Sequence, residues 1–315
     1  MNGASTTPAT PADRYGGAFV GLALGSALGH PVESMSAQQV RIKIGLIESL
    51  RAGGWRGLRR GEHTPEAELA LVLGRALVAV RGYDRAAVAG AYLEWFRAGR
   101  RELEETTRSV FTLMDQGVPF ERVAEEAYEN ATAKDADCAA LLRVVPLVLL
   151  HARDAAALRR DVAAEVSLTD HGRDIMTAAL TYAFLLAAFL RGAGDPAEAL
   201  QATRIALDEC TPPIRCPLAP PAVAAGDLKV RASGRPLDNL ETVWSAVCSA
   251  RRPRNALVRV VSGGEDAATA GALTGALMGA RCGLAGFPND WIEGLLDGFA
   301  FERCAQGLCA IAGCE

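Results

Sequence analysis

The sequence predicts an all-α protein, and three observations lead to this fold class. Nearly every informative stretch repeats its apolar residues at the spacing of an α-helix. Strand signals are nearly absent, and the one alternating stretch, Asp227–Ser233, is short. Half of the residues are hydrophobic, only 6% are aromatic and 32 are glycine, a composition that suits closely packed helices better than a β-sandwich.

The predicted helices begin where capping residues or prolines precede an apolar repeat. Gly82–Asp84 provides an N-cap for the next segment, Gly117–Pro119 precedes an acidic amphipathic segment, and Asp195 with Pro196 starts another. Pro146 predicts a kink or a break inside its helix. The helices expected, in order, are Glu66–Val80, Arg85–Arg97, Phe120–Thr132, Cys138–His151, Ala197–Asp208, Leu237–Ala250 and Thr269–Cys282.

No internal linker divides the 315 residues, so residues 14–315 are expected to form a single domain. The preceding Met1–Asp13 is rich in Thr, Ala and Pro, with neither a basic start nor an apolar run. We expect it to be a disordered tail rather than a signal peptide. The proline-rich stretch Thr211–Gly226 is expected to be a long surface loop within the domain.

Charge and hydropathy exclude two classes of partner. The net charge of −4 and the pI near 5.7 argue against nonspecific nucleic-acid binding, which needs concentrated Lys and Arg. The longest uncharged run, Ile175–Leu190, is shorter than the roughly 20 residues of a membrane span and predicts a buried core helix. A cytoplasmic protein is expected, and no sequence signal defines its oligomeric state.

Eight cysteines raise the question of disulfides or zinc. Cys304, Cys309 and Cys314 recur every five residues, which would spread them around a helix instead of gathering them in a C-x-x-C pair. Free, partly buried thiols are expected, and a redox or metal cluster at the C-terminus is the alternative.

Two glycine-led segments frame the chain: G-L-A-L-G-S-A-L-G-H-P-V-E at Gly21–Glu33, and V-S-G-G-E-D-A-A-T-A-G-A-L-T-G-A-L at Val261–Leu277. Together with four further segments in the same order, they resemble the ADP-ribosylglycohydrolase family, which includes ADP-ribosylarginine hydrolases. The resemblance covers roughly Tyr15 to Asp297 and implies a compact, many-helix orthogonal bundle. The four further segments are Thr64–Ala67, Leu141–Leu147 (L-L-R-V-V-P-L), Ser167–Thr169 with His171, and Phe287–Leu295.

The family resemblance implies a pair of magnesium ions, but the motifs that would hold them are degenerate. The family's T-D-D-T is matched here by Thr64, Pro65, Glu66 and Ala67. Proline suits the first helical turn but supplies no ligand oxygen, and magnesium demands near-octahedral oxygen coordination. Of the family's two aspartates, only a glutamate remains.

The second family motif, G-G-D-x-D-T, has lost its ligands in the same way. Glu265 stands at the first aspartate, while Ala267 and Ala268 replace the last two positions. Asp266 is shifted by one residue, which on a helix start would turn it about 100° away from the ligand direction. No dinuclear Mg²⁺ centre and no cofactor are expected. We expect at most one Mg²⁺ to bind, with Thr64, Glu66 and Glu265 as the residual ligand candidates.

The candidate catalytic residues are the glutamates Glu33, Glu66 and Glu265, which we expect to line one cleft. Glu33 matches a further acid of the family, while Ser26 replaces the aspartate of that motif. Clustered carboxylates raise one another's pKa and suit acid–base work. The alternative is that they are helix N-terminal glutamates stabilised by the backbone dipole. The candidate ligand-binding residues are His63, Thr64, Thr106, Thr107, His171, Gly263, Gly264 and Asp266.

Three interpretations of function stay open at this stage. The first is a divergent hydrolase that cleaves a glycosidic or related bond through these glutamates, with a reduced or absent metal centre. The second is a catalytically inactive relative that serves as a ligand-binding or structural module. The third is a helical protein of unrelated activity. The expected ligand is a small molecule, nucleotide-like or ribose-like.

Overall fold

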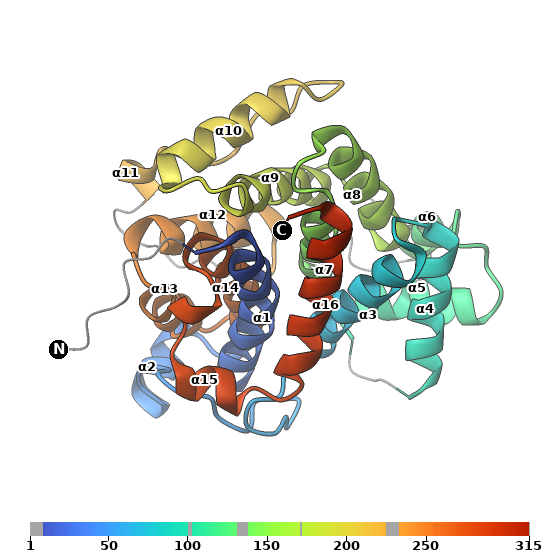
Figure 1. Cartoon of the computed structure of the whole chain (residues 1–315). Coiled ribbons are helices and arrows are strands. Elements are labelled where there is room, and N and C mark those ends of the chain that lie inside the picture. The colour runs from blue at the N-terminus through green and yellow to red at the C-terminus, as the bar shows by residue number, and fades with distance from the viewer. Residues whose placement is uncertain (1–8, 100–102, 131–137, 171, 225–232, 315) are drawn as a thin grey trace.

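The computed structural model describes residues 9–99, 103–130, 138–170, 172–224 and 233–314. Within these ranges every regular element is helical, and the one β-type contact is an isolated bridge between Gly53 and Leu58 (Figure 1). The elements are α1 (Pro11–Gly29), η1 (His30–Val32), α2 (Ala37–Lys43), α3 (Pro65–Val80), α4 (Arg85–Arg97), α5 (Glu105–Asp115), α6 (Val123–Asn130), α7 (Ala139–His151), α8 (Ala155–Thr169), α9 (Arg173–Leu190), α10 (Pro196–Asp208), α11 (Pro221–Ala224), α12 (Pro236–Ser249), α13 (Pro253–Val261), α14 (Ala267–Cys282), η2 (Leu284–Gly286), α15 (Asn289–Gly294) and α16 (Gly298–Ala312).

The all-α prediction is confirmed, and several helix boundaries agree with the sequence because caps define them. Asp84 accepts a hydrogen bond from the backbone of Ala87 at the start of α4, and Asp195 caps α10 in the same way. The main differences are that α6 begins at Val123 instead of Phe120, that α14 begins two residues early, at Ala267, and that the proline-rich loop contains the short helix α11.

The N-terminal boundary is also earlier than expected. Helix α1 begins at Pro11, because Thr10 accepts a hydrogen bond from the backbone N–H of Asp13 and proline suits the first helical turn. The Asp13 carboxylate in turn accepts a hydrogen bond from the backbone N–H of Leu284, 3.0 Å away. Residues 11–13 therefore belong to the folded domain, and residues 1–8 lie outside the described part of the chain.

Helices α1 and α14 form the closest contact in the molecule. They run antiparallel and meet through glycines spaced four residues apart. A Cβ atom on Gly25 would overlap the carbonyl oxygen of Gly271, and one on Gly21 would overlap that of Gly275. At the end of the row, Gly29 lies against the backbone of Ala267. The C-terminal end of α1 is therefore held beside the N-terminus of α14, with only backbone between them.

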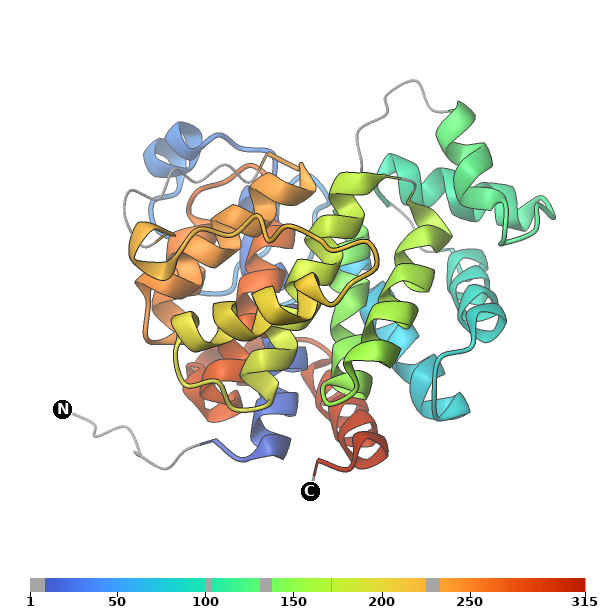
Figure 2. The ribbon, with the colours of Figure 1, turned by 90° about the horizontal axis from the view of Figure 1, so that it is seen from above.

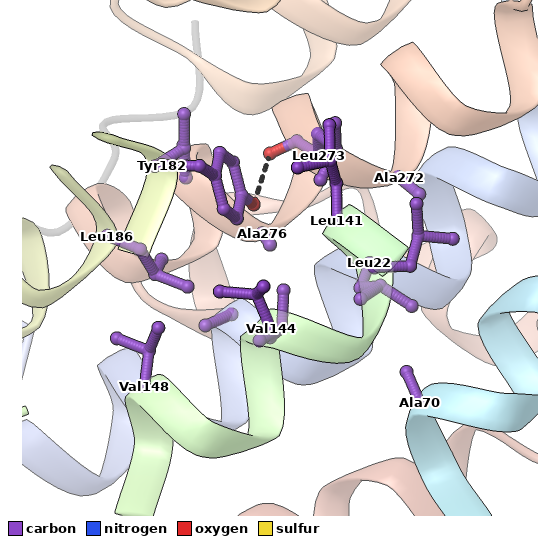
Figure 3. Packing of buried hydrophobic residues seen from close by; sticks show 14 of the residues in the cluster. Leu22, Ala70, Leu141, Val144, Val148, Tyr182, Leu186, Ala272, Leu273 and Ala276 are labelled. Atoms are coloured by element: carbon purple, nitrogen blue, oxygen red, sulfur yellow. Dashed lines mark hydrogen bonds between the residues drawn. The ribbon is translucent and has the colours of Figure 1, made fainter. Parts of the chain in front are cut away.

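The buried side chains form one hydrophobic cluster built around α1, α7, α9 and α14. In Figure 3, Leu22, Val144 and Leu273 from three of these helices point into the same volume. The Tyr182 hydroxyl donates a hydrogen bond to the Leu273 carbonyl oxygen, 3.0 Å away. Helix α7 continues through Pro146 without the expected break, because packing on all sides offsets the hydrogen bond that the proline removes.

Helix α9 is the one described helix that is long and apolar enough to cross a membrane. Its most apolar window is 78% buried within the protein. The prediction that Ile175–Leu190 is a core helix is therefore confirmed.

The cysteine prediction is corrected at the C-terminus, where Cys309 and Cys314 form a disulfide. Helix α16 ends at Ala312, and Gly313 adopts a left-handed conformation with a φ of 62°. The chain thus turns back, and Cys314 donates a backbone hydrogen bond to the Cys309 carbonyl, 3.1 Å away. The expectation of free thiols assumed a continuous helix here. It holds for six other cysteines: Cys138, Cys210, Cys216, Cys248, Cys282 and Cys304.

A buried ionic network joins two of the motif-like segments. The Arg143 guanidinium of α7 lies 2.9 Å from the Glu165 carboxylate of α8 and also donates a hydrogen bond to the Thr169 hydroxyl. The Tyr92 hydroxyl of α4 donates a second hydrogen bond to Glu165 at 2.7 Å, and both charged side chains are fully buried. The L-L-R-V-V-P-L and S-L-T segments therefore meet in the core, where they hold three helices together.

Helices α4, α5 and α6 lie at one end of the molecule. The views of Figure 1 and Figure 2, taken at right angles, both place them at the end opposite to α2, α12 and α13. Helix α5 packs mainly against α4, α6 and α8.

The α1–α14 contact predicts a strong asymmetry between two glycine-to-alanine substitutions. Gly25→Ala is expected to lower the free energy of unfolding by about 1–3 kcal/mol or more, because the new methyl group would push the helices apart. Gly90→Ala, on the open surface of α4, is expected to raise it by about 0.5–1 kcal/mol. Urea unfolding of both variants measures the difference. Equal stability of the two would contradict the close contact.

The ionic network predicts a large effect from removing one charge. Arg143→Leu leaves the buried Glu165 carboxylate without its cation and is expected to cost about 3–5 kcal/mol in unfolding free energy. The double variant Arg143→Leu/Glu165→Leu should recover part of this loss, because the buried Glu165 carboxylate is removed together with its cation, while Asp170, 3.9 Å from Arg143, loses that ion pair in both variants. Chemical denaturation measures both, and a single variant as stable as the wild type would rule out the structural role.

Candidate functional site

Three segments that are far apart in the sequence meet where α1 ends and α14 begins. The Ser26 hydroxyl of α1 accepts a hydrogen bond from the backbone N–H of Thr64, at 3.0 Å, and lies 3.1 Å from its hydroxyl. The Ser34 N–H donates to the Glu265 carbonyl at 2.8 Å, and the Glu265 N–H donates to the Met35 carbonyl at 2.6 Å. The start of α3, the end of α1 and the loop before α14 are thus fixed to one another.

A glycine-rich loop between α2 and α3 adds a fourth segment. Two hydrogen bonds between the backbones of Gly53 and Leu58 close it into a tight turn. Gly54 has a φ of 71°, and a Cβ atom there would overlap the His30 carbonyl oxygen, so the loop packs directly on the end of α1. The two residues at its tip are Trp55 and Arg56.

Arg56 lies between two of the candidate glutamates. One of its terminal nitrogens is 3.2 Å from the Glu33 carboxylate, and the other is 3.0 Å from the Glu66 carboxylate. The Arg56 side chain is only 4% exposed. The indole N–H of Trp55 donates to the same Glu33 oxygen at 2.9 Å, and its ring lies 4.5 Å from the guanidinium carbon. The guanidinium is therefore held in place from three sides.

A third carboxylate, Asp266, completes the cluster. It stands directly before α14 and accepts a hydrogen bond from the Asn239 amide at 2.5 Å. Its negative charge is close enough to Glu33 to raise the pKa of that carboxyl group. We call Glu33, Glu66, Asp266 and Arg56 the acidic cluster: it holds three carboxyl groups and one guanidinium.

The acidic cluster raises the pKa of Glu33 to about 7. The largest cause is burial, which disfavours the charged form. The negative charges of Asp266 and Glu66 raise the pKa further, while Arg56 and the Trp55 hydrogen bond lower it. One guanidinium does not neutralise three carboxylates, so the cluster retains a proton on Glu33 at mildly acidic pH.

The acidic cluster as it stands does not fit a magnesium ion. The Arg56 guanidinium already pairs with both Glu33 and Glu66, so a cation bound between these carboxylates would have to displace it. Within the described residues, no group of three or more His, Cys, Asp or Glu side chains is arranged to hold a metal. The absence of a dinuclear magnesium centre stays a prediction.

The position of Asp266 differs from the expectation, and the catalytic role of Glu265 stays a prediction. Glu265 is exposed and has a left-handed backbone with a φ of 55°, whereas Asp266 lies toward Glu33. The argument from a 100° helical turn fails because α14 starts only at Ala267, so neither residue is helical. Gly264, with a φ of 71°, allows the loop to approach Met35, where a Cβ atom would overlap the carbonyl oxygen. Gly263 is buried beside it.

Two candidate residues at the start of α3 have structural contacts. The His63 ring is buried edge-on against Phe301 of α16, with the ring centres 5.1 Å apart, and burial lowers its pKa. Thr64 is buried and bonded to Ser26, so it joins α3 to α1. Burial and the nearby Arg56 charge also lower the pKa of His30, to about 4, so this side chain is neutral near pH 7.

Thr106 and Thr107 lie on α5, whose main contacts in the described part of the chain are with α4, α6 and α8 and not with the segments that bear the acidic cluster. Both are in the first turn of α5, at the α4–α6 end of the molecule, and Thr107 is fully buried (Figure 2). His171 lies outside the described residues. Their ligand-binding roles stay predictions.

Sequence reasoning missed Arg56, Trp55 and Asn239. The signal for the first two was present in the stretch G-G-W-R-G, where an aromatic and a basic residue lie between glycines that favour a tight loop. Arg56 is 23 residues from its partner Glu33 and 10 residues from its partner Glu66, so no periodicity connects them. Asn239 carries no local signal, because its contact with Asp266 depends on how α12 packs.

The protein is all-helical within the described residues and has a polar cluster where two glycine-lined helices meet. The chain matches the family model described as ADP-ribosylglycohydrolase over residues 7–313. It therefore belongs to the ADP-ribosylglycohydrolase family.

Individual relatives agree with this assignment. The chain is 28% identical to an ADP-ribosyl-[dinitrogen reductase] glycohydrolase of Rhodospirillum rubrum, over 96% of this chain and 98% of that protein. It is 26% identical to an ADP-ribosylarginine hydrolase of Pseudomonas putida, over 96% of this chain and 79% of that protein. A solved structure titled an ADP-ribosylglycohydrolase-related protein complex superimposes with a TM-score of 0.77 at 28% identity, covering 96% and 99% of the two chains.

The raised pKa of Glu33 predicts a pH-dependent stability. Between an unfolded value of 4.5 and a folded value of about 7, the folded protein binds more protons than the unfolded chain. The contribution of Glu33 to the free energy of unfolding is greatest below the unfolded pKa of 4.5. It is lost as the pH rises through the folded pKa of about 7, and the loss is at most about 3 kcal/mol. The groups facing Glu33 in this titration are Arg56, Asp266 and Glu66.

Urea unfolding at about pH 5 and about pH 8 tests this expectation. The wild type should lose more stability over this interval than Glu33→Gln, which cannot titrate at this position. Parallel profiles of the two proteins would show that Glu33 has an ordinary pKa.

Proposed function

We propose that the protein is a divergent hydrolase that cleaves a glycosidic bond to a ribose, with Glu33 as its acid–base group. The observation that carries the proposal is that Glu33 and Glu66 share one buried guanidinium, with Asp266 close enough to act on Glu33, at the junction of the family's glycine-led segments. Three converging carboxyl groups have no purpose in packing, since burying them is costly.

The chemistry follows from the unequal environments of the three carboxyl groups. With a pKa near 7, Glu33 exists in both forms at neutral pH and either donates a proton to the departing group or accepts one from the attacking water. Ionised carboxylates beside it favour the positive charge that develops on the sugar ring. The water oxygen bonds to the anomeric carbon, the glycosidic bond breaks, and its electron pair and a proton leave with the departing group.

The proposed substrate is a small molecule with an ADP-ribosyl or ribose-like group, as the names of the relatives suggest. Trp55 supports a nucleotide-like ligand, because this aromatic residue is 55% exposed beside Glu33 and could contact a ring of the ligand. We propose that no cofactor takes part, that at most one Mg²⁺ binds, and that the protein acts in the cytoplasm.

The second candidate function is a non-catalytic module that binds a ligand of the same class. The observation that favours it is that Arg56 pairs with two of the three carboxylates. A binding module and an enzyme are both expected to be stabilised by ADP-ribose in a thermal shift assay. Only the enzyme releases product.

The proposal predicts little hydrolysis of ADP-ribosylated arginine, with or without magnesium, because general acid–base catalysis alone gives only about 10²–10⁴-fold acceleration. Turnover is expected within a panel of N-linked and O-linked glycosides of ADP-ribose, followed by product release in chromatography. Glu33→Gln should abolish it, whereas Glu265→Gln at the exposed neighbouring site should not. Magnesium-stimulated cleavage of the arginine substrate would refute the metal-free site, and no turnover of any glycoside would favour the binding module.

A further inference from the structure

The acidic cluster contains its own cation. The guanidinium of Arg56 is within ion-pair distance of Glu33 and Glu66 at once, and all three side chains are at least nine-tenths buried. In such surroundings an unpaired carboxylate is strongly destabilising, so some positive charge has to accompany Glu33 and Glu66.

The geometry of the loop shows that Arg56 is positioned for this role. Three of the five residues from Gly53 to Gly57 are glycines with positive φ, which allows the chain to turn sharply on either side of Trp55 and Arg56. The Trp55 ring stacks on the guanidinium, and its N–H donates a hydrogen bond to Glu33. Trp55 and Arg56 of the loop therefore both donate to the Glu33 carboxylate. A neighbouring arginine in the same segment, Arg59, is instead 75% exposed and pairs with Glu62.

We propose that Arg56 is a resident cation that excludes divalent metal ions from the acidic cluster, and that its removal leaves a divalent-cation site formed by Glu33, Glu66 and Asp266. The guanidinium lies between the glutamates and pairs with one oxygen of each, so a divalent ion would have to displace it to bind both. Without it, Glu33 and Glu66 both border the space that the guanidinium leaves, and Asp266 lies close enough to interact electrostatically with Glu33. Hard oxygen ligands of this kind favour Mg²⁺ and Mn²⁺.

The test is cation binding by the full chain, measured apart from any enzymatic activity. Arg56→Ala is titrated with Mn²⁺ by electron paramagnetic resonance and calorimetry, and its melting temperature is followed with increasing Mg²⁺. One bound Mn²⁺ per chain and a melting temperature that rises with Mg²⁺ are expected for Arg56→Ala. The wild type and Arg59→Ala should show neither effect.

Two further variants keep the result decisive. Arg56→Ala/Glu66→Gln should lose the Mn²⁺ site, which shows that the ion binds in the acidic cluster and not elsewhere. Arg56→Lys keeps the positive charge and should bind no Mn²⁺. It provides a folded comparison, checked by circular dichroism.

Two outcomes overturn the proposal. One is a folded Arg56→Ala variant that binds no Mn²⁺. The other is a wild-type protein that binds Mn²⁺ stoichiometrically, and this measurement needs no variant to fold. Both are independent of hydrolysis, so the proposal of a resident cation and the proposed function fail separately.

Discussion

The backbone contact between α1 and α14 is the constraint on which the rest of the structure depends. Glycines at matching positions bring the two helices together without side chains between them. The contact sets the distance between the end of one helix and the start of the other, and the acidic cluster lies at that junction. Van der Waals packing at this separation tolerates no added methyl group, so the position of the site follows from the packing of the core.

Charge balance is the second constraint, and it links two places in the molecule. In the core, Arg143 neutralises Glu165 and connects α7 with α8, with Tyr92 of α4 completing the group. At the α1–α14 junction, Arg56 faces more negative charge than it neutralises. The first group, in which Arg143 also lies 3.9 Å from the buried Asp170 carboxylate, holds helices together. The second is left acidic, which is the arrangement expected where a protein performs chemistry on a bound molecule.

The fold class could be predicted from the sequence, because helical periodicity and capping residues are signals within short stretches of the chain. The ends of α4 and most of α3 and α10 follow from such signals. The site was only partly accessible. Glu33 and Glu66 lie in recognisable segments, but which of Glu265 and Asp266 turns inward depends on one left-handed residue before α14. The role of Arg56 depends on a loop whose partners are distant in the chain, and the Cys309–Cys314 pair depends on a reversal at Gly313.

A guanidinium at the centre of the acidic cluster has a consequence for how the protein responds to its surroundings. A metal ion binds reversibly from solution, so the occupancy of its site varies with the metal concentration, with chelators and with competing ions. Arg56 is synthesised with the chain and is present in every molecule as soon as the loop folds. If Arg56 is the resident cation that we propose, the charge of the junction changes with pH through Glu33 but not with the concentration of magnesium.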